Sequence, residues 1–428
     1  MGVGRRDITP EIGGQLFGYG GGTVSAGVDD PLRATAIWMS CGGTAAILVS
    51  AEVCLVNTAL SDRTRAAVAA ATGVDAKNVI LSATHTHSGP NTAGTVGWGD
   101  YDTAYCEAVF IPRVVEAAAE AARSPRPARM GVAAVRSETG VNRREIVPEG
   151  WVRLGNNPWG AFDAAMTVLS LAEPGSGKPV LTIAHYGAHC TAAFRHPFVS
   201  RDWAGAMLDM LERETGAPAV FLQGASGDVA PRMANAQAIG GPGYAREVGH
   251  LAGLDAMRAL RSVKAWHDTG LETVSGDFAL PLKPRIPPEE ARDRLARATP
   301  GSREEDYYGR VAASYRDNAP ERTHFAMPQT LLALGDVALV PFPFEVFSEI
   351  SLRLRHYSPF QHTLCLSATN GSNGYLPTQE QICRGGYEIE VARTESVWPW
   401  VDDLDTLIIR ENLNLLEKLK CTASDKRK

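Results

Sequence analysis

Short apolar runs alternate along the chain with longer stretches of helical character. The apolar runs at residues 36–39 and 45–50 flank Cys41-Gly42-Gly43-Thr44, which predicts two strands joined by a hairpin. Residues 61–71 have an aspartate and an arginine early and alanines behind, which predicts a helix, and the apolar run 79–82 predicts a further strand. The order strand, helix, strand is typical of an α/β core whose site residues lie at strand ends.

The same alternation extends through the rest of the chain. Further strands are expected at 131–137, 166–171, 179–184, 219–222, 337–341 and 363–368. Further helices are expected at 105–123, 204–214, 244–262, 344–355 and 406–418. The polar stretch 284–330 predicts a surface excursion with a charged helix, and we find no internal repeat in the sequence. We therefore expect an α/β fold with a mixed β-sheet core flanked by helices, in a single domain over residues 1–428.

Composition narrows the class of protein. With 428 residues, 44% hydrophobic and 21% charged, the chain has the make-up of a soluble globular protein. Its net charge of −6 and its lack of a basic run interleaved with aromatics argue against nucleic-acid binding. Because no stretch is apolar enough for a signal peptide or a membrane span, we expect a cytoplasmic protein without stable membrane association. A small molecule is the expected partner, and a homo-oligomer, common for soluble enzymes, stays open.

The seven cysteines are scattered along the chain, odd in number and without Cys-x-x-Cys spacing. This pattern indicates reduced thiols and not a disulfide framework or a zinc ribbon. Cys190 is of interest because it adjoins His189, although such a cysteine is more often a small buried apolar residue.

Candidate chemistry is densest where the apolar run ending at Ser82 gives way to Thr84-His85-Thr86-His87. In extended backbone, residues two apart point to one face, so His85 and His87 would project together from the strand end. Paired imidazoles suit a divalent metal, or one metal ligand beside one proton carrier. The alternative is two histidines that are hydrogen-bonded within a loop.

Other segments place polar residues after apolar runs. His185 and His189 follow the run 179–184, either as structural hydrogen-bonding residues or as part of a shared site. Glu345 follows apolar residues and is expected to open a helix, where its carboxylate would stabilise the N-terminus or bind a metal. Tyr375 lies in a turn, where a tyrosine usually packs and donates one hydrogen bond.

Taken together, these segments resemble the neutral, non-lysosomal ceramidases and their broader bacterial relatives, over about residues 5–390. The matching strings, in the order of that family, are Arg6-Asp7-Ile8-Thr9-Pro10, Ser82-Ala83-Thr84-His85-Thr86-His87-Ser88-Gly89-Pro90, Gly140-Val141-Asn142-Arg143-Arg144, His189-Cys190-Thr191 with Ser200-Arg201-Asp202, Gly227-Asp228-Val229-Ala230-Pro231, Pro343-Phe344-Glu345, and Gly374-Tyr375-Leu376-Pro377-Thr378. The resemblance implies a fold like the ceramidase N-terminal domain, with a zinc site at strand ends and loops.

Carried over position by position, the resemblance implies that zinc is bound by His85, His189, Glu345 and Tyr375. It places His87 beside the zinc, available for proton transfer or for binding the reacting oxygen. Arg143 would contact the substrate or its developing negative charge. Two imidazoles, one carboxylate and one phenol leave room for a water whose pKa zinc lowers.

One departure from the ceramidases bears directly on the reaction. The family has a serine in Gly-Asp-Val-Ser-Pro-Asn that is implicated in amide cleavage, whereas this chain has Ala230 in Gly227-Asp228-Val229-Ala230-Pro231-Arg232. Alanine is neither a nucleophile nor a hydrogen-bond donor. His189-Cys190-Thr191 also departs from the usual His-Pro-Thr, and we see neither the C-terminal immunoglobulin-like domain nor a signal peptide. We therefore expect a small, soluble, polar substrate in place of ceramide.

The leading hypothesis is a zinc-dependent hydrolase of the amidohydrolase type. Water, deprotonated with help from His87 or Asp228, would attack a carbonyl held by the metal and Arg143. An amide or lactam follows from the resemblance, and an ester or lactone is chemically close. The alternatives are a zinc-dependent isomerase, epimerase or lyase acting on a sugar-like compound, and a metal-stabilised binding protein without activity. Loops around five positions would set specificity: Trp98, Trp151, Trp159, His196 and Trp398–Trp400.

Overall fold

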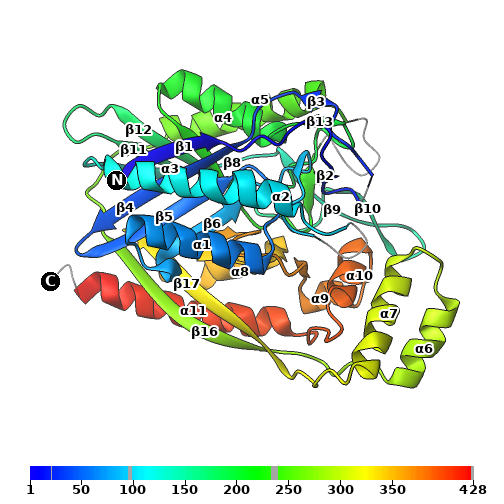
Figure 1. Cartoon of the computed structure of the whole chain (residues 1–428). Helices are drawn as coiled ribbons and strands as arrows, with labels where there is room; N and C mark the ends of the chain where they lie inside the picture. Colours follow the sequence, from blue (N-terminus) through cyan, green and yellow to red (C-terminus); the bar gives the residue numbers. More distant parts are fainter. Residues whose placement is uncertain (21, 95–98, 233–239, 426–428) are drawn as a thin grey trace.

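The computed structural model of the chain describes residues 1–20, 22–94, 99–232 and 240–425. Within these residues the body of the protein consists of four-stranded β-sheets covered by helices (Figure 1). The first sheet has the strand order β1-β4-β5-β6, with bounds Gly2–Asp7, Arg33–Cys41, Thr44–Ala51 and Val79–Ala83. The mixed α/β fold class expected from the sequence is confirmed.

This first sheet shows how the apolar runs are used. Strands β4 and β5 form the expected antiparallel hairpin, and β1 pairs antiparallel with β4 on its other side. The chain then crosses through α1 (Thr58–Thr72) to β6, which runs parallel to β5. Asn57 caps α1 by accepting a hydrogen bond from the Leu60 amide, and Gly73 ends it in a left-handed conformation.

The same arrangement occurs twice more within the described residues. The second sheet has the order β8-β11-β12-β14, with bounds Arg129–Arg136, Ala165–Ala172, Pro179–Tyr186 and Ala219–Gln223. The third has the order β16-β17-β18-β20, with bounds Leu271–Pro281, His324–Leu334, Val337–Pro341 and His362–Leu366. In each sheet two antiparallel steps are followed by one parallel step. The chain therefore has a threefold structural repeat, although we found no repeat in the sequence.

The helices repeat in step with the strands. The parallel crossovers are α1, α4 (Asp202–Thr215) and α8 (Ser348–Tyr357). A second helix after each fourth strand packs back on the sheet: α3 (Ile111–Arg123), α5 (Pro242–Arg261) and α11 (Leu404–Asp425). Figure 1 shows α4 and α5 at the top and α11 at the bottom of the view.

Four of the hydrophobic clusters among the described residues follow from this layout. A central cluster takes side chains from the inner faces of all three sheets, among them Leu48, Ile183 and Leu339. Each outer face forms its own cluster with the helices that cover it. Strands covered on both faces are apolar at nearly every position, which is why the sequence shows them as continuous runs.

Further strands and helices lie between or after the main strands along the chain. They are β2 (Leu16–Phe17), β3 (Gly27–Val28), β7 (Gly89–Pro90), α2 (Thr103–Tyr105), β9 (Gly140–Ile146), β10 (Val152–Asn157), β13 (Phe198–Val199), β15 (Val229–Pro231), α6 (Pro288–Arg297), α7 (Arg303–Arg316), β19 (Glu345–Val346), β21 (Tyr375–Leu376), α9 (Gln379–Ile382) and α10 (Tyr387–Thr394). A short π-helix at Cys106–Phe110 links α2 to α3, and a 3₁₀ helix at Ala76–Asn78 precedes β6. None of the described helices is long and apolar enough to cross a bilayer.

Two predicted boundaries are wrong. Residues 324–330 belong to β17 and not to the polar excursion, because their partner strand β16 covers them along its full length. Glu345 does not open a helix: α8 begins at Ser348, and Glu345 lies in the two-residue strand β19. That strand exists only because it pairs with β21, some thirty residues further along the chain, a partner that local sequence patterns cannot reveal.

Candidate metal centre

Three buried side chains meet where the three sheets end, one from each repeat. His85 follows β6 of the first sheet, His189 follows β12 of the second, and Glu345 follows β18 of the third. One Glu345 oxygen, Oε2, lies 3.0 Å from His189 Nε2 and 3.3 Å from His85 Nε2. The exposed fractions of the three residues are 1%, 0% and 7% in chain order, so solvent does little to screen this cluster.

The hydrogen bonds behind the two imidazoles determine which nitrogen faces the cluster. His85 Nδ1 donates to the Cys54 carbonyl at 2.9 Å, and His189 Nδ1 donates to the Ser226 carbonyl at 2.8 Å. A carbonyl accepts only, so in a neutral ring the proton is on Nδ1 and the lone pair of Nε2 points inward. Among the described residues, His189 Nε2 and Glu345 Oε2 have no hydrogen-bond partner. Hydrogen-bond acceptors that converge without a hydrogen-bond donor fit a cation. Two imidazoles and a carboxylate are ligands that suit zinc.

The pKa values of His85, His189 and Glu345 are shifted by the charges of their neighbours within the cluster. Burial favours the neutral form of Glu345, but His85 and His189 outweigh it and hold the pKa of the carboxyl well below its usual value. Burial also works against a charged His85, yet the Cys54 thiol and Glu345 raise the pKa of that imidazole well above its usual value. Burial, together with Arg143 and His85, lowers the pKa of His189 to about 4. The shifts of His85 and Glu345 have one cause in common, the close approach of the His85 imidazole to the Glu345 carboxylate.

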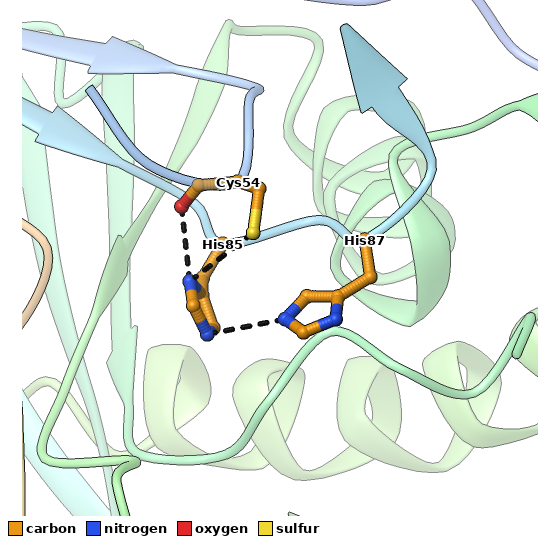
Figure 2. A group of neighbouring side chains, drawn as sticks. All are labelled: Cys54, His85 and His87. Carbon is orange, nitrogen blue, oxygen red and sulfur yellow. Dashed lines mark hydrogen bonds between the residues drawn. The ribbon is translucent and has the colours of Figure 1, made fainter. Parts of the chain in front are cut away.

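His87 is the fourth polar side chain at this point, and it arrives by a different backbone path from the one expected. His85 has φ of 68°, so Thr84–His87 is not a continuation of the strand, and the prediction of extended backbone here is wrong. The left-handed turn at His85 nevertheless brings the rings together, with 3.2 Å between His87 Nε2 and His85 Nε2 (Figure 2). Burial and the two neighbouring imidazoles lower the pKa of His87 well below its usual value, so it is a neutral base.

The N-terminal segment holds the His87 ring. Strand β2 pairs with β7 directly after His87, which brings Gly18 and Tyr19 against the imidazole. The Tyr19 ring meets it edge-on at 4.9 Å between centroids. Gly18 has φ of 128°, and a Cβ added there would stand 2.4 Å from His87 Cγ. Only glycine permits both this backbone conformation and this approach.

Figure 2 shows Cys54 at the edge of the His85 ring opposite to the edge that contacts His87. The Cys54 sulfur is 3.7 Å from His85 Nδ1, the nitrogen that donates to the Cys54 carbonyl. Cys54, His85 and His87 are close enough to form a metal-binding group. We favour the His85, His189 and Glu345 group instead, because the ring edge of His85 that faces Cys54 carries the proton. The sequence analysis did not identify Cys54 as a candidate site residue, although it follows β5 as His189 follows β12.

Tyr375 lies directly opposite Glu345 in the β19–β21 pairing. Arg143, on β9, donates from Nη2 to the Tyr375 hydroxyl at 3.0 Å. Burial, and then Glu345, raise the pKa of Tyr375 well above its usual value, so the metal-free residue is a neutral phenol. The second partner of Arg143 is Glu388, whose carboxylate accepts from Nε at 2.8 Å. The sequence analysis assigned no role to Glu388. The feature that could have drawn attention to it is a carboxylate among the apolar residues of a short helix.

The remaining predicted residues lie elsewhere. Asp228 accepts hydrogen bonds from the backbone amide and hydroxyl of Ser348 and from Asn142, so both of its oxygens are engaged away from the imidazoles. Burial raises the pKa of this carboxyl to about 6. His185 donates to the Cys365 carbonyl at 2.9 Å and does not join His189. The Cys190 thiol is buried and donates to the Thr84 carbonyl.

The aromatic residues expected to set specificity are dispersed. Trp159 is 94% exposed and Trp151 is 55% exposed, so neither is packed in a closed pocket. His196 packs against Phe198. Trp398 lies under Arg285 and Arg322 at the base of the α6–α7 pair, and Trp98 lies outside the described residues.

A large cavity lies far from the cluster. It measures about 900 Å³ and is lined by residues at the opposite ends of the strands, including Cys41, Met130 and Asp336. It shares no residue with the metal-binding group, so we place the candidate site by its chemistry and not by cavity size.

Known proteins resemble this chain in sequence and in fold. A family model described as neutral/alkaline non-lysosomal ceramidase, N-terminal, matches residues 1–242. Neutral ceramidase B of Dictyostelium discoideum is 28% identical over 262 residues, which cover 54% of this chain and 35% of that protein. The match thus spans about a third of that relative's length.

Solved structures extend the likeness to nearly the whole chain. Neutral ceramidase from Pseudomonas aeruginosa has a TM-score of 0.75 and 19% identity, over 98% of this chain and 74% of that one. A ceramidase complexed with C2 has a TM-score of 0.78 and 17% identity, over 98% and 75% of the two chains. At these identities the likeness shows a common fold.

The packing of Gly18 on His87 can be tested by adding one methyl group. Gly18→Ala should lower the free energy of unfolding by roughly 1–3 kcal/mol more than Gly13→Ala, because the ring cannot retreat from the new Cβ. Gly13 is the matched control, with φ of 98° and no atom within 4 Å of an added Cβ. Urea unfolding of the two variants gives the comparison. Equal losses would show that the Gly18 contact with His87 is not tight.

The two histidines after β12 should differ in their effect on metal binding. Purified wild-type protein should hold about one zinc per chain, and His189→Ala should lose it because a ligand is removed. His185→Gln should keep its zinc, since a glutamine amide can still donate to the Cys365 carbonyl. Atomic emission on the folded proteins measures the content. A wild type without zinc, or equal loss in both variants, would contradict the assignment.

Proposed function

Because the chain belongs to the neutral/alkaline non-lysosomal ceramidase family, we propose that it is a zinc-dependent hydrolase that cleaves an amide or lactam bond of a small soluble substrate. The observation that carries the proposal is the convergence of His85 Nε2, His189 Nε2 and the Glu345 carboxylate without a donor among them. With Tyr375 as a fourth ligand, these residues would hold the metal. Zinc in such a site lowers the pKa of a water and polarises a carbonyl, which is the chemistry that amide hydrolysis requires.

Two residues would act on the reacting groups themselves. Arg143 remains a cation, since Tyr375 and Glu388 outweigh the effect of burial and raise its pKa. A buried cation next to the metal ligands would hold the carbonyl oxygen and stabilise negative charge as it develops there. His87 is neutral and its Nε2 lies 3.2 Å from the ligand nitrogen of His85, so its imidazole would accept the proton of the attacking water and pass it to the leaving nitrogen.

Asp228 is better explained as a support than as the base. Its oxygens accept from Ser348 at 2.8 Å, for both the amide and the hydroxyl, and from Asn142 at 3.1 Å. Its own backbone carbonyl accepts from the Arg143 amide. Asp228 therefore ties the N-terminus of α8 to strand β9 and places Arg143, and the role of base falls to His87.

Ala230 supports a substrate other than ceramide. It lies in β15 opposite Val141 of β9, close to Arg143, with 5% of its surface exposed. A methyl group there offers no nucleophile and no donor, so attack by water is the remaining route and no acyl-enzyme forms. Esters and lactones would undergo the same water attack.

Oxygen from solvent distinguishes hydrolysis from its rivals. Zinc-loaded protein incubated with short N-acyl amides and lactams in ¹⁸O-water should give a carboxylate product that carries the label. His87→Ala should lower turnover by roughly 10²- to 10⁴-fold with zinc retained, because a general base is lost. His185→Gln, outside the cluster, serves as the control and should keep turnover. Exchange of carbon-bound hydrogen without ¹⁸O in the product would instead identify an isomerase, epimerase or lyase.

A further inference from the structure

Glu388 is the most deeply buried acidic side chain next to the candidate site that the mechanism above does not use. It lies in the first turn of α10 and is 1% exposed. One carboxylate oxygen accepts from Arg143 Nε at 2.8 Å and the other accepts from Arg144 Nη1 at 2.7 Å. Both oxygens are thus engaged by arginines, which excludes Glu388 as a metal ligand or as a base in this arrangement.

Arg144 anchors Glu388 and takes no part in the metal cluster. It donates from Nε to the Gln381 side chain at 3.0 Å and from Nη2 to the Gly385 carbonyl at 2.6 Å. Its guanidinium also lies over the Phe347 ring at 5.3 Å. Arg144 is 2% exposed and satisfied on all sides, so it provides a fixed positive charge against which Glu388 is held.

Arg143 is held by two contacts in different directions. Nε bonds to Glu388 and Nη2 bonds to the Tyr375 hydroxyl at 3.0 Å. A guanidinium is planar and its five donors have fixed directions, so two such contacts determine the plane and the direction of the third nitrogen, Nη1. The orientation of Arg143 toward the metal ligands therefore depends on a residue that itself touches none of them.

We propose that Glu388 is the positioning residue of the site: it holds Arg143 in the orientation in which the guanidinium binds the carbonyl oxygen of the substrate. This inference rests on the proposed hydrolase function for the identity of the bound group, but the positioning itself belongs to the protein alone. Arg144, Glu388, Arg143 and Tyr375 then form one chain of contacts from α9–α10 to the metal ligands. The α9–α10 segment would thereby determine how well the site binds an oxygen with negative charge.

Two geometric features support the role. Gly386, with φ of 95°, packs against Val152 of β10, which fixes the start of α10 against the hairpin that carries Arg143. The Glu388 carboxylate is paired with both arginines, and removing its charge would leave two buried cations close together without a counter-charge. Loss of Glu388 should therefore displace the more weakly held guanidinium, which is that of Arg143.

The test is a double-mutant cycle on protein loaded with Co²⁺, with acetohydroxamate as the probe. Acetohydroxamate presents a carbonyl and an oxyanion to the metal, and its binding is followed by the visible absorption of Co²⁺. Glu388→Gln and Arg143→Ala should each weaken it by roughly 10- to 100-fold, the range for a hydrogen bond to a charged group. The double variant should be no weaker than Arg143→Ala alone, because Glu388 acts only through Arg143. Each protein is saturated with Co²⁺ before acetohydroxamate is added, because Arg143 contacts Tyr375, a proposed ligand, and its loss would weaken metal binding.

Glu390→Gln is the matched control, since Glu390 is exposed on the same helix. The Glu390→Gln protein should bind acetohydroxamate as the wild type does. Additive losses in the double variant would overturn the proposal, because Glu388 would then act independently of Arg143. A wild type that binds no Co²⁺ would contradict the proposed function and not the positioning. In that case a crystal structure of metal-free Glu388→Gln decides: loss of the Arg143–Tyr375 hydrogen bond supports the proposal, and its retention overturns it.

Discussion

The structure around the site depends on one electrostatic constraint: a buried point where two imidazole nitrogens and a carboxylate converge as acceptors. Each comes from a different sheet, so the three repeats meet at the cluster and none of them could supply it alone. The carbonyls of Cys54 and Ser226 orient the rings from behind, which turns the lone pairs inward. Such an arrangement is costly without positive charge, which a divalent metal would supply.

Two further groups of contacts hold His87 and Arg143 next to this cluster. Gly18 and Tyr19 hold His87 against the cluster from the N-terminal segment. Arg143 lies on the β9–β10 hairpin, and its Nε donates to Glu388. The short strands β9, β19 and β21 carry Arg143, Glu345 and Tyr375, whereas His85 and His189 follow main strands of the first two sheets.

The sequence revealed local features well and long-range pairing poorly. Strands such as β5 and β6 were visible because both faces are buried, and the β4–β5 hairpin because Gly42 and Gly43 mark its turn. The place of Glu345 was misjudged because β19 requires Tyr375 as its partner. The threefold repeat lies in strand order and register and not in shared residues. Of the site, the family resemblance supplied the four proposed ligands, whereas Cys54 and Glu388 became visible only through their contacts.

Zinc K-edge X-ray absorption of the zinc-loaded full chain tests the central claim most directly, because it reports the atoms that surround the metal without a substrate. The account predicts a shell of nitrogen and oxygen at about 2.0–2.2 Å, with outer-shell scattering from two imidazoles. A sulfur neighbour at about 2.3 Å would place the metal at Cys54 and contradict the His85, His189 and Glu345 centre. A shell without imidazole scattering would contradict it equally.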